Sequence, residues 1–312
     1  MYYQKLDFGI TVIDCLFHRP GLAACYLVEQ SGSFALIDCG TKNSVPHILE
    51  VLDSLSVAVE QLAYIIPTHV HLDHAGGAGE LMTYLPNAKL LVHPRGLRHM
   101  CDPGKLQAGA TAVYGEVEFN RTFGGLTPVP EARARAVDDG EEIDLNGRKL
   151  KFIHSPGHAK HHFCIYDAAS QGIFTGDTFG LSYREFDDEN GKFILPTSTP
   201  VQFAPQAWLQ TLDRLMSLNP QRMYLTHFGM VEDVVLLSQQ LRQSIEEYVQ
   251  IAQQCKTAEN RVEKLQQMLL QHTMDKLKAL GKQHTEAEVH SLLDMDIQLN
   301  AQGLDFWLSS QG

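Results

Sequence analysis

Hydrophobic positions in the first third of the chain fall into short runs that predict β-strands. The runs are rich in apolar and β-branched residues, and clusters of turn residues separate them. Residues 45–55 differ, because their apolar side chains recur at helical spacing and form one face. The predicted strands here are 10–17, 24–30, 34–40, 62–68 and 88–94, and the predicted helices are 45–55 and 77–86.

The middle of the chain repeats this alternation after a less regular region. Residues 104–115 predict a helix and residues 122–134 a loop. The pair Asn146-Gly147 lies between two strand-like runs and predicts a tight hairpin turn. The further predictions are a strand pair within 161–177, an amphipathic helix at 204–218 and a last strand at 221–229.

The end of the chain has a different pattern. Residues 231–254 and 261–280 carry apolar side chains at helical spacing, with few turn residues and many Gln, Glu and Lys. We therefore divide the chain into a main domain, 1–230, and a helical C-terminal extension, 231–312. Strands and helices alternate twice in the main domain, which predicts an α/β fold with two sheets and helices outside them.

Composition narrows the class of protein. The 312 residues are 44% hydrophobic, enough for a substantial core, and the formal net charge of -12 disfavours nucleic acid as a partner. No uncharged apolar run is long enough to cross a bilayer, so no membrane contact is expected. The six cysteines form no C-x-x-C pair, and the N-terminus lacks a signal-peptide pattern. We expect reduced thiols and a cytoplasmic protein.

The segment THVHLDHAGG, residues 68–77, concentrates metal-binding side chains: His69, His71, Asp73 and His74. Two histidines at positions i and i+2 of an extended segment point to the same side and can share one cation. If the chain then turns into a helix, Asp73 and His74 approach from another angle, which suits a second cation close to the first.

One cluster cannot complete two coordination shells, so further ligands must lie elsewhere in the chain. His158 in SPGHA, Asp177 in TGD and His227 in THFG each follow a predicted strand. The ends of strands are where a scaffold commonly presents functional side chains. A single H-x-H pair is common by chance, but the complete ordered set is not.

These motifs, taken together, resemble those of the metallo-β-lactamase fold superfamily, in particular its glyoxalase II-like branch. THVHLDH matches the H-x-H-x-D-H motif without a gap, and SPGHA, TGD and THFG match the later motifs in the same order. The resemblance covers about residues 10 to 230 and implies an αββα sandwich. It also implies that the first metal binds His69, His71 and His158, that the second binds Asp73, His74 and His227, and that Asp177 bridges both.

The resemblance implies a hydrolase with two divalent metal ions. Two such cations, two carboxylates and a bridging hydroxide leave a net charge of about +1, which favours attack on a carbonyl group. Imidazole and carboxylate ligands suit zinc, with iron or manganese as alternatives. The expected substrate is a small ester, thioester or lactone, with Asp73 as a catalytic residue as well as a ligand.

Other polar residues have weaker patterns. His162 follows the third-histidine motif and is a candidate for contact with a ligand or the substrate, with a packing or hydrogen-bonding role as the alternative. Tyr183 and Arg184 after TGD are candidates for contact with the substrate. The three histidines of the extension, His272, His284 and His290, are expected to be solvated. The apolar stripes of the extension predict packing on the main domain or a homodimer contact.

Two alternatives to a hydrolase remain open. Persulfide dioxygenases share much of this motif set, so an iron-dependent oxidoreductase is one alternative. A sensor or regulatory protein that retains the metal site is the other. The nuclease branch is disfavoured by the net charge, and β-lactam hydrolysis by the missing signal peptide. The extension shows no arrangement of basic residues for glutathione carboxylates, so glutathione thioesters are not specifically predicted.

Overall fold

The computed structural model describes residues 2–198 and 201–311, which divide into two compact units. The first unit contains the chain up to residue 154 together with 161–176 and 220–232. The second contains 155–160, 177–219 and 233–312. The chain thus passes between the units several times before residue 230, and a domain boundary at that position stays a prediction.

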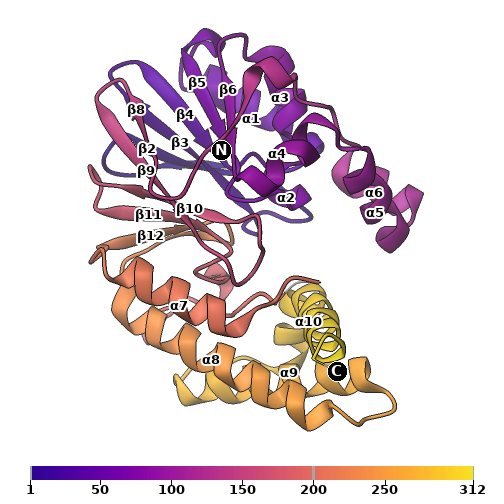
Figure 1. Ribbon diagram of the computed structural model, residues 1–312. Coiled ribbons are helices and arrows are strands. Elements are labelled where there is room, and N and C mark those ends of the chain that lie inside the picture. The colour runs from indigo at the N-terminus through magenta and orange to yellow at the C-terminus, as the bar shows by residue number, and fades with distance from the viewer. Residues whose placement is uncertain (1, 199–200, 312) are drawn as a thin grey trace. The chain divides into compact units, whose positions relative to one another are not determined.

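Two β-sheets form the centre of the first unit (Figure 1). One has seven strands in sequence order, and the other has six strands in the order β13-β12-β11-β10-β9-β8. The first sheet contains β1 Tyr3–Lys5, β2 Ile10–Asp14, β3 Ala24–Gln30, β4 Ser33–Ile37, β5 Leu62–Ile66, β6 Lys89–Val92 and β7 Ala134–Ala136. The second contains β8 Glu142–Leu145, β9 Arg148–His154, β10 Phe163–Asp167, β11 Gly172–Gly176, β12 Arg222–Leu225 and β13 Gly229–Val231.

The core of the first unit lies between these sheets. Buried side chains of both sheets, including Tyr26 and Ile37 from one and Phe152 and Phe174 from the other, form a single cluster. The Tyr26 hydroxyl also donates a 2.5 Å hydrogen bond to the Leu225 carbonyl oxygen, which links β3 to β12. Burial of apolar surface on facing sheets is the main stabilising contribution in such a sandwich.

Helices of the first unit occupy the connections of the seven-stranded sheet, and Figure 1 shows α1 and α3 beside it. The predicted helix at 104–115 is confirmed as α5, whereas sequence patterns missed α4 and α6. Of the predicted loop at 122–134, residues 124–130 are confirmed, whereas its first two residues belong to α6 and its end forms η3 and the start of β7. The helices are α1 Val45–Ser54, α2 Leu72–Ala75, α3 Ala78–Tyr84, α4 Pro94–Cys101, α5 Gly104–Tyr114 and α6 Glu116–Phe123, with short η1 Lys42–Ser44, η2 Val59–Gln61 and η3 Glu131–Arg133.

The second unit is largely helical. The C-terminal extension forms three helices, and Leu237, Leu241, Ile245 and Tyr248 of the first are buried, as their spacing predicted. The predicted fold class is therefore confirmed: an α/β protein with two sheets and a helical C-terminal extension. The helices are α7 Pro205–Met216, α8 Val234–Cys255, α9 Arg261–Ala279 and α10 Glu286–Ser309, with short η4 Arg184–Phe186. A homodimer through this extension stays a prediction.

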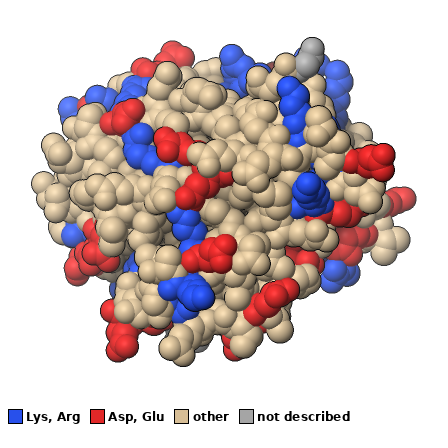
Figure 2. All heavy atoms as spheres, turned by 90° about the horizontal axis from the view of Figure 1, so that it is seen from below, with Lys and Arg blue, Asp and Glu red and all other residues tan. Residues whose placement is uncertain are grey.

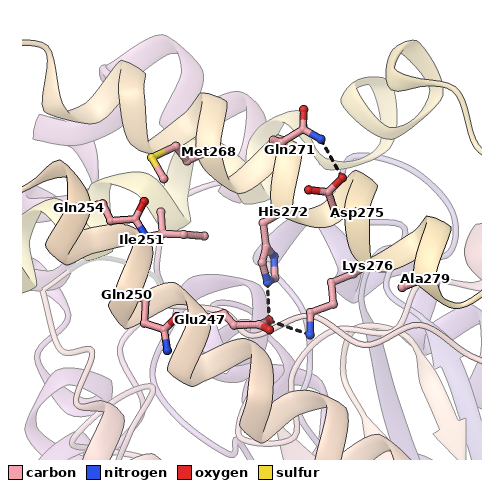
Figure 3. A pocket seen from close by; sticks show the side chains of 10 residues that line it. All are labelled: Glu247, Gln250, Ile251, Gln254, Met268, Gln271, His272, Asp275, Lys276 and Ala279. Carbon is pink, nitrogen blue, oxygen red and sulfur yellow. Dashed lines mark hydrogen bonds and ion pairs between the residues drawn. The ribbon is translucent and has the colours of Figure 1, made fainter.

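A groove of about 520 Å³ runs between α8 and α9 (Figure 3). In it the Glu247 carboxylate lies 2.7 Å from His272 Nε2 and 2.7 Å from Lys276 Nζ. The expectation that His272 is solvated was wrong, because this contact and the ring of Tyr248 cover its side chain. His290, by contrast, is exposed as expected.

Charged side chains of both signs are interspersed on the face drawn in Figure 2. This mixture is consistent with a chain that has 37 acidic and 25 basic residues. Among the described residues, no helix is both long enough and apolar enough to cross a membrane.

Candidate metal centre

The segment that follows β5 has the local geometry predicted from its sequence. His71 is extended (φ -64°, ψ 149°) and is the residue before the single helical turn α2. His69 Nε2 lies 2.8 Å from His71 Nδ1, so the two imidazoles face each other. Asp73 and His74 lie in α2 itself. The extended-then-helical path therefore presents two sets of candidate ligand atoms from six consecutive residues.

Asp73, His74 and His227 come together within the first unit. Asp73 Oδ2 lies 3.6 Å from His74 Nε2 and 3.3 Å from His227 Nε2. One ligand atom from each of the three residues lies within 4.8 Å of the others. His227 comes from the loop after β12, so a residue more than 150 positions away completes the group.

His158 and Asp177 belong to the second unit. His158 Nε2 lies 3.3 Å from Asp177 Oδ2, and both side chains are buried. Asp177 directly follows β11, as the strand-end argument predicted. The two residues therefore form a second imidazole–carboxylate pair.

Three of the predicted histidine ligands have their Nδ1 atoms held by protein acceptors. His74 Nδ1 bonds to Asp38 Oδ2 at 2.9 Å, His227 Nδ1 to the Leu22 carbonyl at 2.6 Å, and His158 Nδ1 to the Thr197 carbonyl at 2.8 Å. A neutral imidazole that donates through Nδ1 has its lone pair on Nε2. Each of these Nε2 atoms faces a carboxylate oxygen, an arrangement that a divalent cation would stabilise. The donor set therefore fits a metal.

Asp38 is a functional candidate that the sequence analysis missed. Its buried carboxylate accepts from Thr68 N at 2.7 Å, from Thr226 Oγ1 at 2.6 Å and from His74 Nδ1. It thereby joins the end of β4 to both segments of the first unit that carry predicted metal ligands. The available signal was its position near the end of the predicted strand 34–40, the criterion that selected His158, Asp177 and His227.

His162 and its neighbour His161 lie beside the first two histidines. The His162 ring stacks on that of His69 with centroids 4.7 Å apart, and both rings are buried. His161 Nδ1 accepts a 3.4 Å bond from Val70 N, and its ring meets that of His71 edge-on. The role predicted for His162 stays a prediction. No role was predicted for His161, although its ring lies beside that of His71 as the His162 ring lies beside that of His69.

Tyr183 and Arg184 have partners in the second unit. The buried Tyr183 hydroxyl donates to Asp296 Oδ1 of α10 at 3.1 Å. Arg184 Nη1 forms a 3.0 Å ion pair with Asp187. Their predicted contact with substrate stays a prediction.

Asn300 of α10 supports the backbone that orients His158. Its buried side-chain oxygen accepts from Ser198 N at 2.5 Å and from Ser198 Oγ at 3.0 Å, and its amide nitrogen donates to the Pro196 carbonyl at 3.2 Å. The Thr197 carbonyl, which His158 Nδ1 contacts, lies between these two anchored residues. A helix of the C-terminal extension therefore fixes the surroundings of a predicted metal ligand.

Comparison with known proteins adds a family and several relatives. The family described as the metallo-beta-lactamase superfamily matches residues 18–227. The metallo-beta-lactamase fold-containing protein ST1585 of Sulfurisphaera tokodaii is 29% identical over 221 residues, which cover 70% of this chain and 77% of that protein. Its crystal structure superposes with a TM-score of 0.63 at 24% identity, covering 92% of this chain and 93% of the other.

Two further relatives differ in the share of this chain that they cover. The structure of the metallo-beta-lactamase family protein TTHA1429 of Thermus thermophilus has a TM-score of 0.69 at 18% identity, covering 97% of this chain and 94% of the other, and so supports the fold. A hydroxyacylglutathione hydrolase of Aeromonas hydrophila is 28% identical over 153 residues. These cover 49% of this chain and 45% of that enzyme, less than half of each.

Proposed function

This chain belongs to the metallo-beta-lactamase superfamily, and on that premise we propose that it is a hydrolase with two divalent metal ions that acts on a small ester, thioester or lactone. The observation that carries the proposal is the shared geometry of His74, His227 and His158. Each is held through Nδ1 and turns Nε2 toward a carboxylate. This preorganisation is typical of metal ligands and has no evident structural purpose.

We assign the ligands by the order of the family motifs. His69, His71 and His158 would hold one metal, Asp73, His74 and His227 the other, and Asp177 would bridge them. Zinc is the metal proposed, because the donors are imidazoles and carboxylates, and iron and manganese accept the same donors. The predicted ligands would then be held in position by contacts with Asp38, His161 and His162, which would not bind a metal themselves.

The residues of this chain have distinct tasks in such a reaction. When bound, the metals would supply Lewis acidity and lower the pKa of water. The Leu22 and Thr197 carbonyls and the Asp38 carboxylate hold three imidazoles in one tautomer and orientation. Asp73 is placed beside His74 and His227, where it can orient the attacking water as well as bind metal.

The proposal does not specify which of the three bonds, ester, thioester or lactone, is hydrolysed. A hydroxyacylglutathione hydrolase is among the relatives, which supports thioesters as one class to test, but it shares less than half its length with this chain. Esters and lactones require the same attack on a carbonyl carbon, so the three classes are tested together.

The test combines elemental analysis with a substrate panel. Protein purified without added metal or chelator should contain about two equivalents of zinc or manganese per chain, and should hydrolyse at least one of the three classes. Asp73→Asn should lower kcat/KM by roughly a hundredfold or more, whereas Asp53→Asn on the exposed side of α1 should not.

Other metal contents would support a different function or contradict the proposal. Predominant iron, with oxygen consumed in the presence of a persulfide, would favour the oxidoreductase alternative. Less than about one equivalent of any metal, with none taken up on titration, would overturn the dinuclear assignment.

A further inference from the structure

The connection between β6 and β7 carries three helices, of which α5 and α6 stand out from the sheets of the first unit (Figure 1). None of the eleven residues of α5 is buried, although the helix contains Leu106, Val113 and Tyr114. A solvent-exposed helix with large apolar side chains is not explained by packing of the core.

This connection packs against the metal-binding segment. Val70, Leu72 and Gly76 line a small cavity together with Met100 of α4 and Leu106 of α5. The start of α5 therefore lies next to the turn that carries Asp73 and His74. Helices anchored in this way are suited to form one wall of a binding site.

A second loop reaches the same region. The Asp14 carboxylate accepts from the backbone of Leu16 at 2.9 Å and of Gly21 at 2.7 Å, which closes the loop between β2 and β3. At the end of this loop, the Leu22 carbonyl bonds to His227 Nδ1. The loop is thus fixed directly to a predicted metal ligand.

A row of four aromatic rings connects this loop to α5 and α6. His18 meets Phe17 with centroids 4.3 Å apart, Phe17 meets Phe123 at 5.9 Å, and Phe123 meets Tyr114 at 5.3 Å. Phe17 and Phe123, in the middle, are buried. His18 and Tyr114, at the two ends, are exposed, Tyr114 by 41%. The row therefore presents aromatic surface to solvent at both ends.

Both exposed rings lie within electrostatic reach of Asp73. Partial burial raises the pKa of the Tyr114 phenol, and the Asp73 carboxylate raises it further. Partial burial and Arg121 lower the pKa of His18, while Glu118 and Asp73 act in the opposite direction. Both rings therefore respond to the charge of Asp73, and the loop that carries His18 is fixed to His227 through the Leu22 carbonyl.

Two of the cations near this row are paired with acidic side chains. Arg121 donates to both carboxylate oxygens of Glu118, at 2.9 and 2.6 Å. Lys42 lies 3.0 Å from Glu80. Such neutralised pairs do not favour an anionic arm of a substrate, whereas exposed aromatic faces favour an apolar one.

We propose that Tyr114 and His18 are specificity-determining residues that contact an apolar alkyl or aromatic group of the substrate beside the metal centre. The inference rests on the proposed hydrolase function and narrows its substrate class. It assigns to α5 and the loop after β2 a role in selecting substrates by the size of an apolar group.

The experiment compares the metal-loaded wild type with Tyr114→Ala and His18→Ala on acetyl, butyryl and octanoyl esters of one leaving group. The ratio of kcat/KM for the octanoyl ester to that for the acetyl ester should fall by about tenfold in each variant, mainly through KM. Val117→Ser is the matched control, because Val117 is an apolar residue of α6 that is 84% exposed and lies outside the row. Its ratio should equal that of the wild type.

A binding measurement separates this inference from the proposed function. Calorimetric titration with octanoate and acetate should show tighter binding of octanoate to the wild type, and about a tenfold smaller preference in Tyr114→Ala. If no ester is hydrolysed, the titration still decides the inference. Equal affinities for the two carboxylates, or a preference unchanged in both variants, would overturn it, even if the esters are hydrolysed.

Discussion

Asp38 Oδ2 lies 2.9 Å from His74 Nδ1, and both side chains are buried. The same carboxylate also accepts hydrogen bonds from Thr68 and Thr226, so all its donors come from the segments that carry predicted ligands. A buried carboxylate with this many donors holds the second group of predicted ligands in a fixed position.

Replacing Asp38 with Asn should therefore weaken metal binding without removing a ligand. The amide would turn one acceptor into a donor facing His74 or a threonine, and would leave a buried hydrogen bond unmade. We expect the affinity of the more weakly held metal to fall by about 10- to 100-fold, as measured by competition with a chromogenic chelator. Asp53→Asn on the exposed side of α1 serves as the control. Equal affinities in the two variants would contradict this role.

Replacing Asn300 with Leu tests the link between the C-terminal extension and His158. Leucine has a similar size but cannot accept from Ser198 or donate to the Pro196 carbonyl. We expect a loss of about 1–3 kcal/mol in the free energy of unfolding and a clear fall in metal affinity. Gln298→Leu, two residues earlier and exposed, is the control in both measurements. A destabilised Asn300→Leu variant with unchanged metal affinity would limit Asn300 to stability.

Two arginine–carboxylate pairs, one buried and one exposed, allow a test of how burial changes the effect of losing the arginine on stability. Arg148 donates from Nε and Nη2 to Asp167 at 2.9 and 2.5 Å inside the first unit, and the exposed Arg121 contacts Glu118 in the same two-point way. Arg148→Leu should lower the free energy of unfolding by about 3–5 kcal/mol, because it leaves Asp167 charged and buried. Arg121→Leu should lower the free energy of unfolding in urea far less, because solvent screens the exposed pair. Similar losses of unfolding free energy in the two variants would contradict this prediction.

His93 predicts a dependence of stability on pH. Burial, with contributions from His154 and Arg95, lowers its pKa from 6.5 to about 4. The unfolded chain then binds the proton more tightly, so the stability due to neutral His93 is complete above pH 6.5 and is lost as the pH falls from there toward about 4. Between about pH 7 and about pH 5, this contribution should decrease by about 2 kcal/mol.

The matched variant is His93→Asn, because His93 Nδ1 accepts from Arg95 N at the start of α4 and asparagine can do the same. Urea denaturation of the two proteins in chelator removes the effect of metal loss from the comparison. The variant should lose about 2 kcal/mol less than the wild type over this pH range. Identical pH dependence would show that His93 titrates normally.

Local patterns were sufficient where neighbours in sequence determine the structure. The six residues from His69 to His74 present two sets of candidate ligands because an extended segment followed by a helical turn is a local geometry. The hairpin at Asn146-Gly147 formed as predicted, with positive φ at both residues, because two-residue turns require it. The buried face of α8 followed from helical spacing in the same way.

The sequence by itself therefore determined the fold class, the strands and helices with strong periodicity, and the candidate metal ligands. Only the tertiary structure decided which residues hold those ligands in place. Asp38 meets Thr226 across 188 positions, and Asn300 meets Ser198 across 102. It also decided that His272 is covered by Glu247 and that the row from His18 to Tyr114 exists. These contacts join distant segments, and no periodicity along the chain records which side chains the packing of sheets and helices brings together.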